Sequence, residues 1–140
     1  MTRRDEDELA REILTRFGTI AVVGLSRDPA KAAHAVPAAL QSAGYRVIPV
    51  NPSAERILGE RAYPSLADVP EPVEIVNVFR PAGEAAAVAE QAVAAGARAF
   101  WLQLDLVSPE ARAIAERSGL LYVEDRCIAV DRARFAVSKR

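Results

Sequence analysis

A series of short apolar runs, separated by helical segments, most constrains the fold of this 140-residue chain. The runs are continuous rather than alternating, which is typical of strands buried on both faces of a parallel sheet. They comprise residues 19–23, 45–52, 73–79, 97–104 and 120–125. Because parallel strands need long crossover connections, this alternation of strand and helix predicts a parallel α/β sheet.

The intervals between the runs carry helix signals. The predicted helices are residues 1–17, 31–43, 81–95, 108–118 and 127–137. Pro37 is expected near the first turn of its helix or at a kink, and Ser65 is expected to cap a single turn within a loop-rich connection over residues 57–70. The sequence shows no internal repeat or linker. It therefore predicts one doubly wound, mostly parallel, Rossmann-like α/β domain over residues 1–140.

Composition narrows the classes of function. The formal net charge of −1 does not favour nucleic-acid binding, which usually needs a basic stripe, and no apolar run approaches membrane-spanning length. The charged, acidic N-terminus is unlike a secretory signal peptide. Cys127 is the single cysteine, which leaves no internal disulfide and no zinc site built from cysteines. We therefore expect a cytoplasmic protein without a membrane or nucleic-acid partner.

The loop after the first run has the features of an anion site. In the stretch AVVGLSRDPAK, Gly24 permits a tight turn or a close backbone approach, and Ser26 offers a hydroxyl. Arg27 and Lys31 add two positive charges beside a predicted helix N-terminus. The alternative interpretation is a turn glycine flanked by solvated surface cations. The combination of two cations and a hydroxyl in one strand-to-helix loop favours a phosphate site.

The residues after the second run bear on the kind of nucleotide. Dinucleotide sites for NAD place an Asp or Glu there to hold the ribose hydroxyls. This chain instead has Asn51, followed by Pro52, so the acidic marker for NAD is missing. A simple turn is the alternative interpretation of this pair.

Further candidates lie at other strand ends and at the helix that follows the first loop. Arg80 is suited to pairing with a phosphate or covering an adenine face, with a solvated salt bridge as the alternative. Phe79 is more typical of a core, whereas Gln103 is a polar group at the end of an apolar run and suits a directional hydrogen bond to a ligand. His34 lacks a serine or cysteine partner for nucleophilic catalysis, so we expect a ligand contact instead.

Several segments together resemble a known family. The segments are AVVGLSRDP, GYRVIPVNP, ILGERAYPSLADVP, IVNVFRP, WLQL and EDRCI, in this order from about residue 19 to residue 131. They look like the small stand-alone CoA-binding proteins, which resemble the CoA-binding domain of the succinyl-CoA synthetase alpha chain. The resemblance implies a Rossmann-like domain that holds CoA or acyl-CoA across the strand ends.

The resemblance also assigns residues to parts of the ligand. The residues implied at the CoA phosphates are Gly24, Ser26, Arg27 and Lys31. Those implied at the adenosine side are Asn51 and Pro52, and those along the pantetheine route are Phe79, Arg80 and Gln103. Two positions depart from the family pattern. Many relatives have a tyrosine at the position of His34 and a glycine at that of Asp105. An acidic side chain at residue 105 is expected to narrow the pocket or to disfavour anionic acyl groups at the thioester end of CoA.

The preferred hypothesis is a CoA or acyl-CoA binding protein without catalysis that acts as a carrier, a sensor or a partner of an enzyme. The sequence shows no carboxylate pair, metal cluster or triad, and no separate substrate domain. The synthetase's phosphorylated histidine belongs to another domain, so the resemblance does not imply ligase activity. One alternative is an NADP-linked oxidoreductase or a redox-sensing module that uses Cys127. Another is an interaction protein with a vestigial pocket and an unidentified protein partner.

Overall fold

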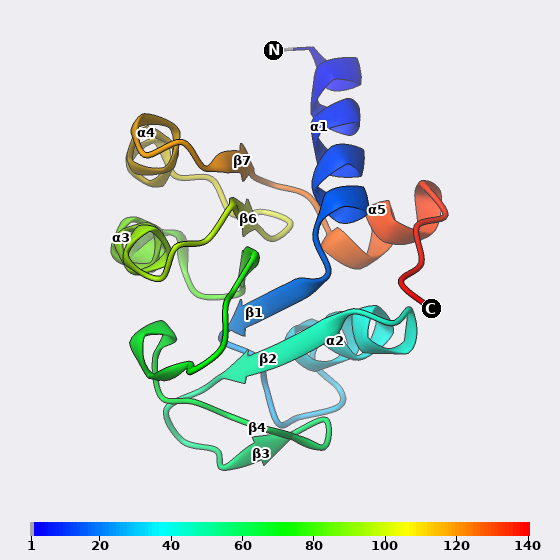
Figure 1. Ribbon diagram of the computed structural model, residues 1–140, viewed down its shortest axis with the longest axis vertical. Helices are drawn as coiled ribbons and strands as arrows, with labels where there is room; N and C mark the ends of the chain where they lie inside the picture. Colours follow the sequence, from blue (N-terminus) through cyan, green and yellow to red (C-terminus); the bar gives the residue numbers. More distant parts are fainter. Residues whose placement is uncertain (1) are drawn as a thin grey trace.

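One parallel sheet of five strands organises the molecule (Figure 1). The computed structural model describes residues 2–140. The strands are β1 (Thr19–Val23), β2 (Arg46–Val50), β5 (Ile75–Val78), β6 (Ala99–Leu102) and β7 (Leu121–Val123). Their order in the sheet is β2-β1-β5-β6-β7, and every pair is parallel. The chain therefore first extends the sheet on one side of β1 and then crosses to its other side, which places the topological switch point between β1 and β5.

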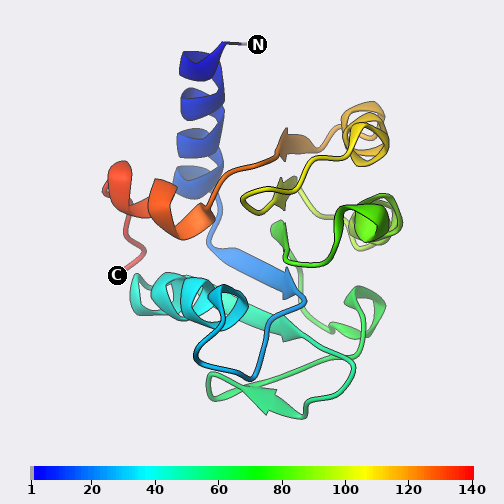
Figure 2. The same ribbon diagram turned by 180° about the vertical axis from the view of Figure 1, so that it is seen from behind.

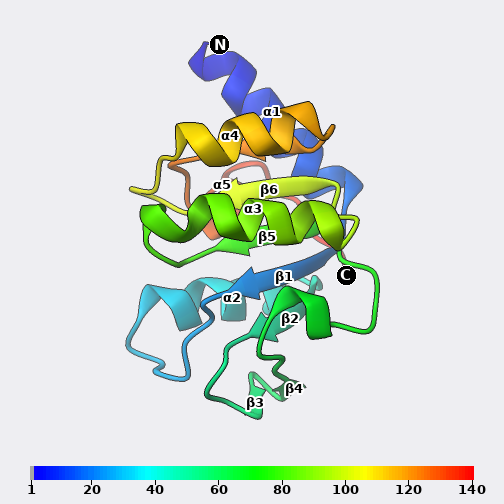
Figure 3. The ribbon, with the colours of Figure 1, turned by 90° about the vertical axis from the view of Figure 1, so that its left-hand side faces the viewer.

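Helices cover both faces of this sheet (Figure 3). One face carries α3 (Ala85–Ala94) and α4 (Pro109–Arg117), and the other carries α1 (Arg3–Arg16), α2 (Ala32–Ser42) and α5 (Ile128–Arg134). Side chains alternate along β1, with Val23 in the core beneath α3 and Val22 in the core beneath α1 and α2. This two-layered core confirms the predicted doubly wound, Rossmann-like fold.

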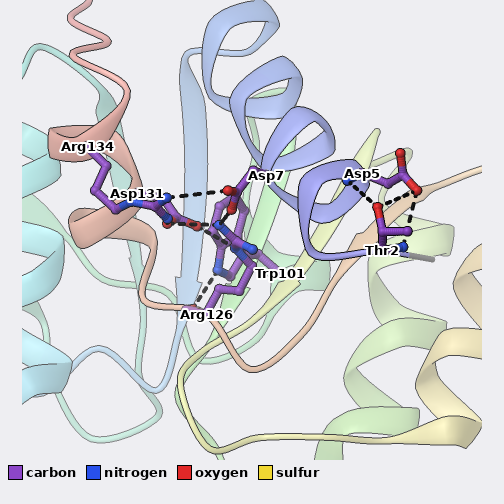
Figure 4. Close-up of polar contacts among 7 residues, drawn as sticks. All are labelled: Thr2, Asp5, Asp7, Trp101, Arg126, Asp131 and Arg134. Carbon is purple, nitrogen blue, oxygen red and sulfur yellow. Dashed lines mark hydrogen bonds and ion pairs between the residues drawn. The ribbon is translucent and has the colours of Figure 1, made fainter.

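The N-terminal helix lies within the predicted range 1–17. A capping box begins it, because Thr2 Oγ1 accepts from Asp5 N at 3.1 Å and an Asp5 carboxylate oxygen accepts from Thr2 N at 3.1 Å (Figure 4). Ile13 and Leu14 are fully buried, and the helix contacts β7 and α5. At the back of the molecule, α2 and α5 lie side by side (Figure 2).

The connection over residues 57–70 contains more structure than predicted. β3 (Arg56–Ile57) and β4 (Glu60–Arg61) form an antiparallel hairpin around Leu58 and Gly59, whose φ angles are 56° and 75°. Such a short hairpin has too few residues for a visible period-two pattern. Ser65 precedes a 3₁₀ turn, η1 (Leu66–Asp68), as predicted, but it does not cap the turn. Its hydroxyl donates to Asp68 Oδ2 at 2.9 Å.

The helix predicted over residues 81–95 is divided into two parts. Its first turn is the 3₁₀ helix η2 (Ala82–Glu84), and α3 begins at Ala85. The division matters for the site, because η2 brings Glu84 back toward the strand end at Arg80.

Candidate functional site

A groove of about 900 Å³ lies at the carboxyl edge of the sheet, where the loops that follow β1 and β5 lead to helices on opposite faces at the switch point. The loops after β1, β2 and β5 form its walls together with α3. Most of the predicted site residues line it, namely Gly24, Ser26, Arg27, Lys31, Asn51, Pro52, Phe79 and Arg80. Sequence reasoning missed other lining residues, which include Asp28, Ser53, Ser65, Glu84, Val88 and Gln91.

Gly24 forms the turn that leads from β1 into the groove. Its φ of +91° lies in the left-handed region, and its N–H donates to Val50 O at 3.0 Å. A Cβ atom at this position would lie 3.0 Å from Arg80 Cδ. Glycine at residue 24 therefore avoids both a strained backbone conformation and a tight contact with Arg80.

A proline in α2 helps to fix the loop after Gly24. Pro37 lies in the middle of α2 rather than in its first turn, and it has no N–H to donate to the carbonyl of Ala33, four residues earlier. That carbonyl accepts instead from Ser26 N at 3.0 Å. The hydroxyl oxygen of Ser26 accepts in turn from Asp28 N at 3.0 Å. The loop is thus tied back onto the start of the helix that follows it.

The loop still presents donors to the groove. Within residues 2–140, the backbone N–H groups of Arg27 and Ala33 donate no hydrogen bond, and both residues line the groove. Arg27 and Lys31 are exposed and form no ion pair with any described residue. Free amides near a helix N-terminus, together with unpaired cations, form a concave site suited to a phosphate group.

Asn51 links two walls of the groove. Its Nδ2 donates to Leu25 O at 2.9 Å, and its Oδ1 accepts from Ser53 N at 2.7 Å. A carboxylate at this position could make the second contact but not the first, because it has no proton to donate. These two hydrogen bonds therefore explain why residue 51 carries a side-chain amide, whether or not a ligand is bound.

Arg80 lies at the end of β5 and pairs with Glu84. Its Nε is 3.2 Å from Glu84 Oε1, and its second terminal nitrogen is 2.9 Å from Glu84 Oε2. The hydrogen bonds of this pair lower the pKa of Glu84 and raise that of Arg80, so both groups are charged at neutral pH. Opposite charges four residues apart can pair along a helical turn, so the spacing of Arg80 and Glu84 was a sequence signal that could have predicted this ion pair. Phe79 is half-buried and packs against the core while it also lines the groove.

Two predicted site residues lie outside the groove lining. Gln103 is 6% exposed, and its Oε1 accepts from Asn77 Nδ2 and from Ile128 N, both at 3.3 Å. The side chain is thus part of a buried network between β5, β6 and α5. His34 lies in the first turn of α2, is half-buried and does not line the groove.

Cys127 and Asp105 also lie away from the groove. Cys127 is half-buried at the start of α5. Its neighbour Arg126 is engaged by two carboxylates, Asp131 at 2.6 Å and Asp7 of α1 (Figure 4). Asp105 is exposed and has a φ of 71°, and its N–H donates to Asp125 Oδ1 at 2.7 Å.

Neither a metal site nor a membrane-spanning helix is found in the part of the chain that the structure describes. No cluster of three or more His, Cys, Asp or Glu side chains there has a geometry able to hold a metal ion. No helix within residues 2–140 combines the length and the apolar character that a membrane crossing requires.

The parallel sheet with its groove at the switch point defines a Rossmann-like α/β protein. The family described as a CoA binding domain matches residues 18–133, and the chain belongs to this family. The resemblance noted in the sequence is thereby confirmed.

Individual relatives agree with this assignment. The Bacillus subtilis protein YneT is 43% identical over 123 residues, which cover 88% of this chain and 91% of that protein. The structure of a hypothetical protein from Pyrococcus horikoshii is 38% identical, with a TM-score of 0.91 over 98% of this chain and 99% of the other. The ADP-forming acetate–CoA ligase II of Archaeoglobus fulgidus is 35% identical over 66 residues, which cover 46% of this chain but 10% of the ligase.

Proposed function

We propose that the groove binds coenzyme A or an acyl-CoA, with the ligand phosphates at the loop between β1 and α2. The observation that carries this proposal is the arrangement of unpaired donors at the switch point. Within residues 2–140, the N–H groups of Arg27 and Ala33 donate no hydrogen bond and the cations Arg27 and Lys31 form no ion pair, and these groups meet there in a chain that belongs to a CoA-binding family. CoA carries a diphosphate and a separate 3′-phosphate, which suit several dispersed positive groups.

The rest of the ligand follows the walls of the groove. In this proposal the adenosine lies toward Asn51 and Pro52, and the pantetheine arm passes Phe79 and Arg80. Arg80, whose side chain lies against Gly24, stands at the phosphate end of that arm. Val88 of α3 adds an apolar contact on the same side of the groove. We do not propose that Gln103 or His34 contacts the ligand directly, because neither residue lines the groove.

The proposed role is binding without catalysis, as a carrier, a sensor or a partner of an enzyme. The lining of the groove contains no histidine and no cysteine, so it offers no pairing of a nucleophile with a histidine base. The acetate–CoA ligase has the matching segment within a much longer chain, and its activity is therefore not transferred to this protein. A cytoplasmic location belongs to the same proposal, since CoA carries a free thiol and the cytosol keeps thiols reduced.

Calorimetric titration with CoA, dephospho-CoA and NADP at fixed salt tests the proposal. We expect CoA to bind and the loss of its 3′-phosphate to weaken binding by about 1 kcal/mol or more. The double variant Arg27→Ala/Lys31→Ala should weaken CoA binding about tenfold or more. The matched control is Arg3→Ala/Arg4→Ala, which removes two exposed cations from α1, a helix that contributes nothing to the groove.

The other outcomes separate the competing functions. Tight NADP binding with little affinity for CoA would favour the oxidoreductase or redox-sensing alternative. No affinity for any of the three ligands would favour an interaction protein. An unchanged CoA affinity in the double variant would contradict the assigned position of the phosphates.

A further inference from the structure

Glu84 occupies an unusual place in the groove. It is the last residue of η2 and directly precedes α3, where a carboxylate ordinarily accepts from the free N–H groups of the helix. Its side chain makes no such capping bond. Both carboxylate oxygens instead accept from Arg80, at 3.2 and 2.9 Å.

Arg80 therefore differs from the other cations that line the groove. Arg27 and Lys31 have no ion-pair partner within residues 2–140, whereas two N–H groups of Arg80 are held by one carboxylate. A phosphate group uses the same forked geometry on a guanidinium. A carboxylate and a phosphate cannot occupy the same two N–H groups at once.

We propose that Glu84 is an internal competitor for the ligand's phosphate, holding Arg80 in the free protein and thereby lowering the affinity of the groove for CoA. The inference rests on the proposed function, since it takes CoA as the ligand. Two effects act in the same direction. The phosphate has to displace the carboxylate from Arg80, and the carboxylate, still part of the groove lining, then repels the bound anion.

The chain offers a closely matched control for this charge. Glu12 and Arg16 form another pair four residues apart, on α1, with side chains 46% and 47% exposed. In the Arg80–Glu84 pair both side chains are 49% exposed. Glu84→Gln and Glu12→Gln thus remove the same charge from similar ion pairs, one in the groove and one outside it.

The experiment is calorimetric titration of the natural protein, Glu84→Gln and Glu12→Gln with CoA at low and at high salt. Glu84→Gln should bind CoA about fivefold more tightly at low salt, with a smaller gain at high salt, because salt screens exposed charges. Glu12→Gln should match the natural protein. The gain from Glu84→Gln should be smaller in an Arg80→Gln background, where no guanidinium remains to be released and only the repulsion between the carboxylate and the ligand is relieved.

Each remaining outcome has a definite meaning. If the natural protein binds CoA and Glu84→Gln binds it equally or more weakly, Glu84 is not a competitor, while the proposed function stands. An equal gain in Glu12→Gln would assign the effect to net charge and overturn the inference. Failure of all three proteins to bind CoA would overturn both the inference and the proposed function.

Discussion

The side chain of Arg80 lies directly against Gly24, so that a Cβ atom at residue 24 would sit 3.0 Å from Arg80 Cδ and 3.3 Å from Arg80 Cγ. This contact joins the loops that follow β1 and β5, on the two sides of the switch point. The aliphatic part of Arg80 packs there while its guanidinium reaches Glu84. The position of a charged group in the groove thus depends on the absence of a side chain at residue 24.

Gly24→Ala should destabilise the protein by about 2 kcal/mol, because it adds a strained positive φ to a crowded contact with Arg80. Urea unfolding measures the loss. Gly59→Ala is the control, since Gly59 also has a positive φ, +75°, but nothing lies within 4 Å of its Cβ position. It should cost about 1 kcal/mol. Equal losses in the two variants would show that the Arg80 contact adds no cost.

Pro37→Ala should loosen the loop of the groove. The variant places an N–H four residues after Ala33, where it competes with Ser26 N for the Ala33 carbonyl. We expect faster amide hydrogen exchange at Ser26, by about tenfold, while helix α2 is retained. Exchange at Gly24, whose N–H donates to Val50 O, is the internal reference. Unchanged exchange at Ser26 would mean that both donors share the carbonyl without loss.

Asp105→Gly should stabilise the protein by about 0.5 kcal/mol, because glycine adopts the φ of 71° without strain. The bond from residue 105 N to Asp125 Oδ1 is made by the backbone and is retained. Asp105→Ala keeps the strain without the carboxylate and serves as the control. Neither variant should change CoA affinity, since residue 105 does not line the groove. A change in affinity would instead place the carboxylate near the thioester end.

Asp7→Asn should reduce stability at neutral pH and less so in acid. Hydrogen bonds from Arg126, and secondarily from Arg134, hold the pKa of Asp7 below its usual value of 3.8 (Figure 4). A carboxyl whose pKa is lowered by folding contributes stability above its unfolded pKa and loses it as the pH falls through the folded value.

The difference in unfolding free energy between the natural protein and Asp7→Asn should therefore be largest at neutral pH and should shrink below about pH 4. Urea unfolding at both pH values measures it. Glu8→Gln is the control on the same helix, since Glu8 forms a long, exposed pair with Arg4 at 3.8 Å. A difference for Asp7→Asn that persists at low pH would show that the ion pair is not its source.

The local sequence determined the strands of the parallel sheet, the helices that cover it and most of the groove residues. Continuous apolar runs such as residues 19–23 and 75–78 match buried parallel strands, because burial on both faces removes the polar alternation. Parallel strands bring their carboxyl ends to one edge, so residues that follow them, such as Gly24, Asn51 and Arg80, meet even though they are far apart in the chain.

The tertiary structure alone decided the strand order and the direction of individual side chains. Gln103 directly follows β6, yet its amide turns to Asn77 and to the backbone of Ile128, because burying it there requires hydrogen-bond partners. The carbonyl of Ala33, which Pro37 leaves without a donor, accepts from Ser26 N, and Arg80 pairs with Glu84. Sequence periodicity reports which face of an element is apolar, whereas the partner of a polar group depends on which segments packing brings beside it.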